Sequence, residues 1–323
     1  YKRQYLTLIL LGIPLTMAYN MEAALLRAIG NSLTPLYFLL FSTVLNIGLD
    51  IAFMGPLQLG VGGAAAATVV AQGISAVLCG WYIIRNYPAL HFTHNAFANG
   101  KKFAANMFWA GLSMGLMSAI YNLVDSIYVA QVSELDFLAL SYAYPVQLMM
   151  VAFCAGTGVG FNALFAQRLG AGQKEEANRV ACHGFLFYGL CWLLFLAFAL
   201  LGAPLFFRLS TDNAAVAAAG ASYLVICCGL SIGMCMQFLT ERLLQTTGHP
   251  AGFMIVQGSG AILNIILDPV FIFGLDMGVV GAAAATVIGQ ISGACIGFFL
   301  LWRIRGEFSV SFRGFRPDRA LSA

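Results

Sequence analysis

The sequence predicts an all-α polytopic membrane protein, and three observations support this fold class. Hydrophobic residues make up 60% of the 323 residues, charged residues make up 9%, and the mean hydropathy is +0.85. A soluble domain usually carries about 25% charged residues. The apolar residues form runs long enough to cross a hydrocarbon core of roughly 30 Å as helices. In addition, residues 44–72 recur at 262–290 without an insertion.

Nine apolar runs, each about 20 residues or longer and separated by short polar clusters, are predicted to be transmembrane helices. In chain order they cover residues 5–25, 34–54, 61–84, 103–131, 137–163, 180–206, 215–241, 251–274 and 279–302. The strands of a membrane barrel would alternate apolar and polar residues over about 10 positions, and the runs show no such alternation. The eight cysteines all fall inside these spans without a CxxC pair, so we interpret them as small packing residues.

Basic residues between the spans predict the orientation of the helices, because cytoplasmic loops concentrate Lys and Arg. If the first span runs inward, the inner segments hold thirteen of the sixteen basic residues, namely Arg27, Arg85, Lys101, Lys102, Arg168, Lys174, Arg179, Arg242, Arg303, Arg305, Arg313, Arg316 and Arg319. Lys2, Arg3 and Arg208 remain on the outer side. The sequence therefore predicts a cytoplasmic C-terminus and an external first residue.

The repeat predicts how the chain is organised. The segment LNIGLDIAFMGPLQLGVGGAAAATV corresponds to LNIILDPVFIFGLDMGVVGAAAATV at a constant shift of 218 positions. Position 1 corresponds to residue 219, so the first copy lacks counterparts for roughly three spans of the second copy. Because the sequence also begins with Tyr, we expect it to be truncated at the N-terminus. Three further helices would give two six-helix repeats with the same orientation, related by an axis along the membrane normal.

On this basis we expect four segments. They are the C-terminal half of a first lobe with three helices, a cytoplasmic linker, a complete second lobe of six helices and a cytoplasmic tail, covering residues 1–85, 86–101, 102–305 and 306–323.

Carboxylates inside the predicted spans are the first candidates for a functional site, since each costs at least about 2.5 kcal/mol at the centre of a span. Asp50, Asp125 and Asp268 are the clearest. At 1.5 Å per residue, Asp125, Asp268 and Thr286 are predicted to lie at about the same depth, roughly 10 Å below the outer surface.

An amide and a hydroxyl accompany these carboxylates. Asn264 lies four residues before Asp268 and so shares its helix face. The same pattern occurs in the first copy, as Asn46, Asp50 and Thr68. Such a group can hold a proton between carboxylates or bind a hard cation such as Na⁺. Alternatively, Asn264 and Asp268 hydrogen-bond between helices and hold a bend near Pro269.

Other polar and soft side chains have two possible roles. A cavity for flat, hydrophobic cations would suit Met and aromatic walls, although such residues in a helix bundle are more often ordinary packing. The candidates are Met114, Met117, Tyr121, Gln147, Met234, Met236 and Gln237. Glu22 and Glu241 lie close to Arg27 and Arg242 near the inner ends of their spans, which favours interfacial ion pairs.

Several function classes are disfavoured. The chain shows no Ser-His-Asp constellation, Cys-His pair or acidic metal cluster, so we do not expect an enzyme. The net charge of +3 is spread over the predicted cytoplasmic loops, which indicates no nucleic-acid surface.

The repeated block N-I-x-L-D-x-x-F followed by G-V-x-G-A-A-A-A-T resembles the multidrug and toxic compound extrusion (MATE) transporters. The segments YNLVDSIYVA at 121–130 and AQRLGAGQKEEANRVA at 166–181 are similar to the same family. The resemblance covers essentially the whole chain and corresponds to helices four to twelve of a twelve-helix protein.

The resemblance implies a V-shaped pair of six-helix lobes in a bacterial inner membrane. It implies a monomer that exports organic cations or other amphipathic drugs in exchange for H⁺ or Na⁺, without a further cofactor. In some members an Asp from helix one, with an Asn, an Asp and a Thr from helices five and six, binds the coupling ion. The last three match Asn46, Asp50 and Thr68, and the second-lobe counterpart of the first is Asp125.

These matches place a possible Na⁺ at Asp50 or Asp125. Other members use carboxylates in helices seven and ten, where this sequence has approximately Tyr121 and Met236. Two alternatives remain open. One is a flippase for lipid-linked oligosaccharides from the same superfamily, which would need a basic central cavity. The other is a membrane-embedded lipid-processing enzyme, which would need clustered Asp residues at a cytoplasmic helix end.

Overall fold

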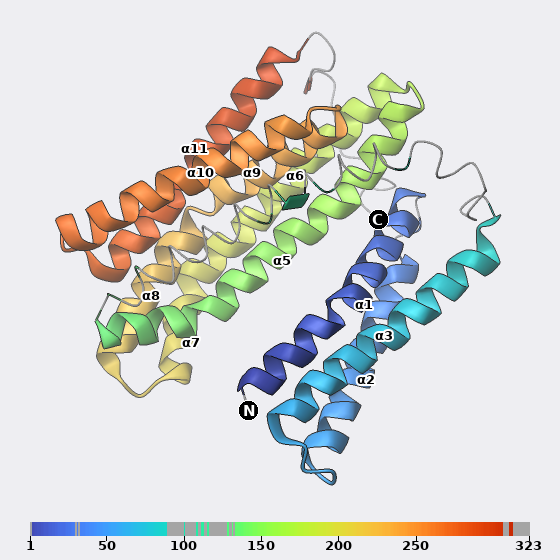
Figure 1. Ribbon diagram of the computed structural model, residues 1–323. Helices are drawn as coiled ribbons and strands as arrows, with labels where there is room; N and C mark the ends of the chain where they lie inside the picture. Colours follow the sequence, from blue (N-terminus) through green and yellow to red (C-terminus); the bar gives the residue numbers. More distant parts are fainter. Residues whose placement is uncertain are drawn as a thin grey trace. The chain divides into compact units, whose positions relative to one another are not determined.

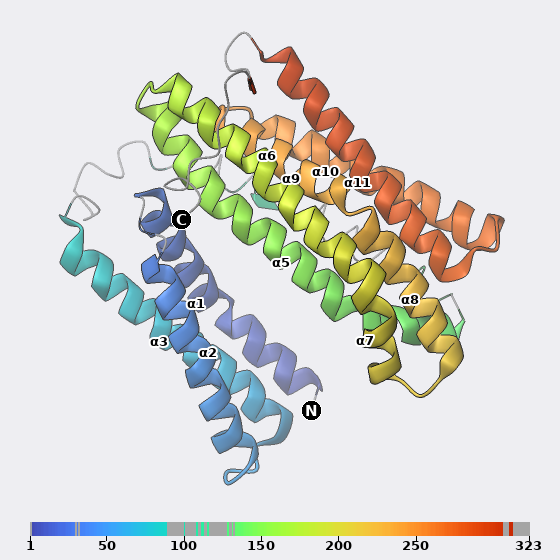
Figure 2. The same cartoon turned by 180° about the vertical axis from the view of Figure 1, so that it is seen from behind.

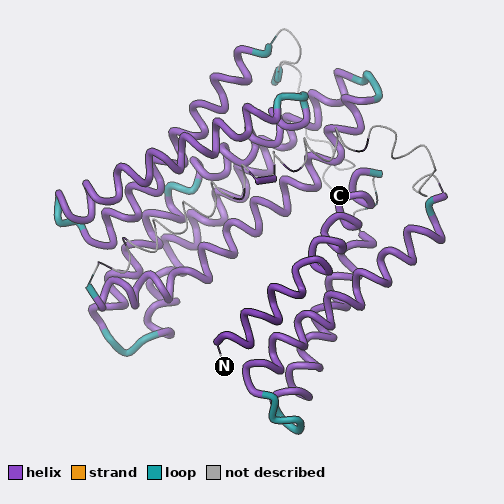
Figure 3. The backbone as a smooth tube through the Cα atoms, in the orientation of Figure 1, coloured by secondary structure: helices purple, strands orange, loops and turns teal. Residues whose placement is uncertain are grey.

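The computed structural model describes residues 2–29, 31, 33–88, 133–305 and 310–312, together with the isolated positions 100, 108, 111, 112, 115, 128 and 131. Within these ranges the chain is built from helices and short turns, with no strand (Figure 3). The all-α class predicted from composition and run length is therefore confirmed. By its internal contacts the chain divides into two units, Tyr1–Lys101 and Lys102–Ala323, which we call unit 1 and unit 2.

Unit 1 contains three helices that alternate in direction, α1 (Lys2–Ala28), α2 (Leu33–Met54) and α3 (Gly60–Asn86) (Figure 1). Helix α3 packs along both other helices, which touch each other much less. Its contact face is lined by small buried side chains such as Ala65, Ala67 and Ala71. Small residues let helix axes approach closely. In lipid the hydrophobic effect does not drive helices together, so close van der Waals packing stabilises their association instead.

Unit 2 is the larger bundle, and Figure 2 shows its helices from behind. Its helices are α5 (Glu134–Gly170), α6 (Lys174–Ala197), the π-helical segment η3 (Phe198–Gly202), α7 (Ala203–Ser210), α8 (Ala214–Gly229), α9 (Ile232–Thr246), α10 (Pro250–Pro269), the π-helical segment η4 (Val270–Gly274) and α11 (Gly278–Arg303). Helix α11 packs against α8, α9 and α10, and α5 packs against α6, α8 and α9. Tyr188, Phe165 and Phe207 are fully buried in this core.

Local sequence explains where several helices begin. Ser133 caps α5 by accepting a hydrogen bond from the Asp136 backbone N–H at 3.2 Å, and Asn213 caps α8 by accepting from Ala215 and Val216 at 3.0 and 3.3 Å. Such side-chain oxygens satisfy backbone donors that have no partner within the helix. Pro250 starts α10, where its missing N–H costs nothing.

Eight of the nine predicted spans coincide with described helices. Seven helical segments are long and apolar enough to cross a membrane individually, and α8 with α9, which are bent by 43° at the break between them, meet the same criterion as a pair. The remaining prediction, 103–131, lies almost wholly outside the described residues. The predicted span 215–241 corresponds to two helices, because the chain breaks between α8 and α9.

The break is stabilised by side chains that replace the lost helical hydrogen bonds. The Ser231 hydroxyl donates to the Cys228 carbonyl at 2.7 Å, and the Trp192 indole N–H donates to the Gly229 carbonyl at 3.0 Å. The Gly229 carbonyl would otherwise be left without a partner at a helix end, whereas the Cys228 carbonyl also accepts from the Ser231 backbone N–H at 3.3 Å. A Cβ on Gly233 would come within 3.0 Å of the Ile291 backbone nitrogen. The glycine therefore lets the start of α9 lie directly against α11.

Candidate functional site

The first copy of the predicted site forms between α2 and α3. The Asn46 side-chain amide donates to the Thr68 hydroxyl at 3.3 Å, and that hydroxyl donates in turn to the Ala64 carbonyl at 3.1 Å. Asp50, one helical turn after Asn46, is half-buried. Its Oδ1 atom is shielded from solvent and has no hydrogen-bond partner among the described residues.

The second copy forms in the same way between α10 and α11. The Asn264 amide donates to Asp268 Oδ1 at 3.2 Å and more weakly to the Thr286 hydroxyl at 3.5 Å. Asn264 and Asp268 are each only 3% exposed. The Asn264 amide oxygen is buried without a hydrogen-bond partner among the described residues. In both copies the amide is thus bonded to the hydroxyl, and in the second copy it is bonded to the carboxylate as well.

The two copies differ in which oxygen is left unmatched. In unit 1 it is a carboxylate oxygen of Asp50, and in unit 2 it is the amide oxygen of Asn264. An unmatched buried acceptor costs about 1–3 kcal/mol. Each trio therefore presents an oxygen that would be stabilised by a cation or by a proton donor. Carboxylate, amide and hydroxyl oxygens are also the ligand types that hard cations prefer.

Two turns with the same backbone geometry fix the register of the paired helices. Leu59 N–H donates to the Phe53 carbonyl at 2.9 Å, and Met277 N–H donates to the Phe271 carbonyl at 3.0 Å. Gly60 and Gly278 open α3 and α11 with φ of +56° and +53°. Positive φ is the conformation that glycine adopts most readily. Because both turns are alike, Thr68 and Thr286 lie at matching positions beside their asparagines.

Close approach of α10 and α11 holds the second trio. A Cβ on Gly289 would come within 2.7 Å of the Gly260 carbonyl oxygen and 3.3 Å of the Asn264 Cβ. Immediately after Asp268, Pro269 removes one backbone donor and the π-helical segment η4 follows. Proline and π segments are recognised causes of local changes in helix direction. The carboxylate therefore lies where α10 departs from regular geometry.

The remaining predicted residues are placed as follows. Asp125, Met114, Met117 and Tyr121 lie outside the described residues. Gln147 joins α5 to α8, because its amide donates to the Tyr223 hydroxyl at 2.6 Å.

Methionines of α9 belong to the packed interior of unit 2. Met234 is buried in the apolar core, and Met236 is partly buried against it. Gln237 is half-buried and its amide donates to Glu241.

The interfacial ion pair expected for Glu241 is not what the structure shows. Glu241 is 4% exposed, and its Oε1 accepts from the Gln237 amide at 3.0 Å. Arg242 instead donates to Gln245 at 3.0 Å and lies over the Phe253 ring at 5.7 Å. Adjacent residues on a helix point about 100° apart, which separates the two charges. The four-residue spacing of Gln237 and Glu241 was the sequence signal for this pair.

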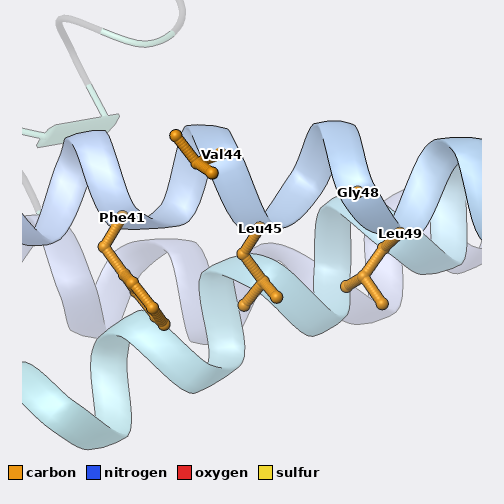
Figure 4. Close-up of a pocket in the computed structure, with 5 residues that line it drawn as sticks. All are labelled: Phe41, Val44, Leu45, Gly48 and Leu49. Carbon is orange, nitrogen blue, oxygen red and sulfur yellow. The ribbon is translucent and has the colours of Figure 1, made fainter.

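Hollows lie on the surfaces of both units. One, of about 300 Å³, is lined by apolar residues of α2, namely Phe41, Val44, Leu45, Gly48 and Leu49 (Figure 4). The other, of about 520 Å³, lies between the α9–α10 turn and the end of α11 and includes His249 and Arg303. None of the predicted cavity residues lines either hollow.

Comparison with protein families gives one match. Residues 110–270 match the MatE family model. Among curated proteins, the chain is 32% identical over 179 residues to "Probable multidrug resistance protein YpnP" of Bacillus subtilis (strain 168), which covers 53% of this chain and 39% of that protein. It is 26% identical over 211 residues to "Multidrug export protein MepA" of Staphylococcus aureus (strain MRSA252), covering 64% and 46%.

A third relative carries a different substrate in its name. The "FAD transporter" of Shewanella oneidensis is 26% identical over 206 residues, covering 58% of this chain and 43% of that protein. The matched part of this chain thus spans less than half the length of these three relatives.

Solved structures agree with the fold. An outward-facing multidrug resistance MATE family transporter of the MOP superfamily aligns with a TM-score of 0.61 and 27% identity, over 65% of this chain and 47% of that chain. A MOP superfamily transporter from Pyrococcus furiosus aligns over 94% of this chain and 69% of that chain, with a TM-score of 0.78 and 18% identity. The second comparison concerns the fold alone.

Proposed function

The chain belongs to the MATE family, and on this basis we propose that the protein is a secondary antiporter that exports organic cations or other amphipathic compounds in exchange for H⁺ or Na⁺. The observation that carries the proposal is the doubled trio of amide, carboxylate and hydroxyl. Both trios lie between membrane-spanning helices, and each leaves one buried acceptor oxygen unmatched. Intramembrane carboxylates of this kind mark ion pathways in transporters.

The proposed coupling follows from what an ion would change at these sites. At Asp50, a proton or Na⁺ neutralises the carboxylate and satisfies Oδ1, which has no hydrogen-bond partner among the described residues. At Asp268, it neutralises a carboxylate whose hydrogen-bond partner, Asn264, holds the unmatched amide oxygen. The free energy gained favours whichever helix arrangement holds the ion best, as in any two-state equilibrium shifted by a ligand. At Asp268 the adjacent Pro269 and η4 give α10 a place to bend. Ion binding would then drive the change that exposes a drug cavity alternately to the two sides of the membrane.

The cavity and the second-lobe acid Asp125 belong to the proposal as well. We assign Asp125 a role in ion binding, as we do Asp50, and Met114, Met117, Tyr121, Gln147, Met234, Met236 and Gln237 a role near the substrate. The curated relatives are named for multidrug export and for FAD, which is an anion. Flat cations are proposed here because Met and aromatic side chains bind them through polarisable and π surfaces.

The test uses the protein as its gene encodes it, reconstituted in liposomes. Ethidium efflux is measured with a pH gradient and with a Na⁺ gradient imposed separately. We expect one gradient to drive efflux in the wild type. Asp50→Asn, Asp125→Asn and Asp268→Asn should reduce that efflux roughly 5- to 150-fold, the usual range of coupling free energies.

The matched control is Asp212→Asn, because Asp212 is exposed in the turn before α8. It should leave gradient-driven efflux unchanged. Efflux that needs neither gradient would rule out antiport. Efflux that survives in all three aspartate variants would rule out the proposed ion site.

A further inference from the structure

Glu241 is a second buried carboxyl group of unit 2 that the proposed coupling at Asp268 does not use. It lies in the last two turns of α9 and is 4% exposed. A carboxylate buried in a membrane protein is costly unless it has partners or holds a proton. Its partners therefore indicate its role.

Its hydrogen-bond partner is an amide and not a cation. Gln237 Nε2 donates to Glu241 Oε1 at 3.0 Å from one turn earlier on α9. A glutamine amide carries both a donor and an acceptor, so it can donate to a carboxylate or, after turning, accept from a carboxylic acid. Gln237 is thus able to serve both protonation states of Glu241 without another residue moving.

Glycines of α10 and α11 leave room for the Gln237 amide. A Cβ on Gly293 would lie 3.0 Å from Gln237 Cδ and 3.2 Å from its Oε1, and one on Gly260 would lie 3.9 Å from Nε2. The amide therefore fills a notch that glycine creates at the junction of α9, α10 and α11. Because no side chain stands at these positions, the amide has space to turn.

The same junction connects Glu241 with the second ion trio. Gly260, beside the Gln237 amide, touches Gly289 through its backbone, and a Cβ on Gly289 would be 3.3 Å from the Asn264 Cβ. Asn264 then donates to Asp268 at 3.2 Å. A row of close neighbours therefore leads from Glu241 through Gln237, Gly260 and Gly289 to Asn264 and Asp268.

The charges around Glu241 come mainly from its own helix. Helices α5, α6, α10 and α11 pack against α9. Arg242, the next residue on α9, is the charged group that acts on Glu241, but its side chain is engaged with Gln245 and Phe253.

Ionisable groups on the neighbouring helices hold partners of their own. The Tyr188 hydroxyl of α6 donates to the Cys154 carbonyl of α5 at 2.9 Å, and His183 Nδ1 lies 2.8 Å from the Arg179 carbonyl. Asp268 of α10 accepts from Asn264. On α11, Arg303 lies at the helix end beside His249, and Cys295 is exposed.

We infer that Glu241 is a proton-binding site of unit 2, with Gln237 as its positioning residue, and that its protonation is linked through the glycine junction to the state of the Asp268 trio. The second part rests on the proposed transport function. The reaction is simple binding, in which the carboxylate takes one proton from water and becomes a carboxylic acid. Glu241 is not at the position where the resemblance predicts a carboxylate in this span. That position is occupied by approximately Met236.

The test reads the carboxyl group directly. Infrared difference spectra of the reconstituted protein are recorded from about pH 4 to about pH 9, a range that spans the usual values of carboxyl groups and their common shifts. We expect a C=O band of a protonated carboxyl that titrates within this range, disappears in Glu241→Gln and persists in Glu175→Gln. Glu175 is an exposed residue in the first turn of α6 and serves as the matched control.

Two further variants keep the inference falsifiable if Glu241→Gln does not fold. Gln237→Leu retains the carboxyl but removes its partner, so the band should remain and titrate at least about one pH unit away from the wild-type position. Asp268→Asn should keep the band but move its titration if the two sites are linked. A Glu241 band that is absent at every pH, or unmoved in Gln237→Leu, would overturn the proton site.

Efflux is measured on the same samples, so the two proposals can fail separately. A titrating Glu241 band in a protein without gradient-driven efflux would leave the proton site standing and refute antiport. Efflux with no such band would refute the proton site alone.

Discussion

At the scale of single residues, the functional chemistry lies in a few unmatched oxygens. Asp50 Oδ1 and Asn264 Oδ1 are both buried and lack a partner among the described residues, although their surroundings have the same sequence pattern. A side-chain amide can be turned to exchange its donor and acceptor. Turning Asn264 would place its oxygen toward Asp268, which is favourable when that carboxyl is protonated or when a cation lies between them.

Two glycines at equivalent turns provide a prediction at this scale. Gly60 and Gly278 have φ of +56° and +53°, and a Cβ on Gly60 would meet nothing within 4 Å, whereas one on Gly278 would lie 3.1 Å from Asp136 Oδ2. An L-residue in this conformation costs roughly 1–2 kcal/mol. Gly60→Ala should therefore lower the melting temperature modestly, and Gly278→Ala should lower it more.

Thermal unfolding of the purified protein in one detergent measures both variants. Asp136→Ala is then added to each variant to remove the contact with Asp136. The extra decrease in melting temperature of Gly278→Ala should disappear, and the decrease of Gly60→Ala should stay the same. Equal melting temperatures for the two single variants would show that backbone strain dominates and that the Asp136 contact is unimportant.

At the scale of elements, the packing of α10 against α11 links stability to the ion trio. The helices meet backbone to backbone at Gly260 and Gly289, next to Asn264. Gly289→Ala should push them apart and cost about 1–3 kcal/mol, the usual range for overpacking. Because Asn264 lies against the same position, gradient-driven efflux should fall as well.

The matched control for this substitution is Gly156→Ala on α5, where a Cβ would meet nothing within 4 Å. In a helix interior this change is expected to be neutral or to stabilise by up to about 1 kcal/mol. Thermal unfolding and ethidium efflux are compared for both proteins. If Gly289→Ala unfolds and transports like Gly156→Ala, the close helix contact does not support the site.

At the scale of the whole molecule, the duplication predicts which turns share a side of the membrane. Leu57 and Leu275 occupy equivalent turns in the two copies and are 58% and 59% exposed. Ala171 lies in the turn between α5 and α6, within a segment rich in basic residues. Helices of a parallel repeat carry equivalent turns to the same face.

Labelling of single cysteines in intact cells tests this arrangement. A membrane-impermeant maleimide should label Leu57→Cys and Leu275→Cys directly, and Ala171→Cys only after permeabilisation. The unmodified protein provides the background, since its eight cysteines are free and six of them are buried. Opposite labelling of Leu57→Cys and Leu275→Cys would contradict a parallel repeat.

The sequence by itself determined the helical class, eight described spans, the duplication and the composition of the two trios. These features follow from local properties: apolar run length sets a span, and four-residue spacing puts Asn46 with Asp50, and Asn264 with Asp268, on one helix face. The tertiary structure decided which oxygen each amide satisfies, that the chain breaks between α8 and α9, and that Glu241 turns to Gln237 instead of an arginine. The Asn46–Thr68 bond and the Trp192–Gly229 bond at the break join different helices, so they depend on how closely those helices approach, because a hydrogen bond forms only within about 3 Å. Glu241 and Gln237 share one helix face, and the packing around α9 decides that Glu241 is buried there.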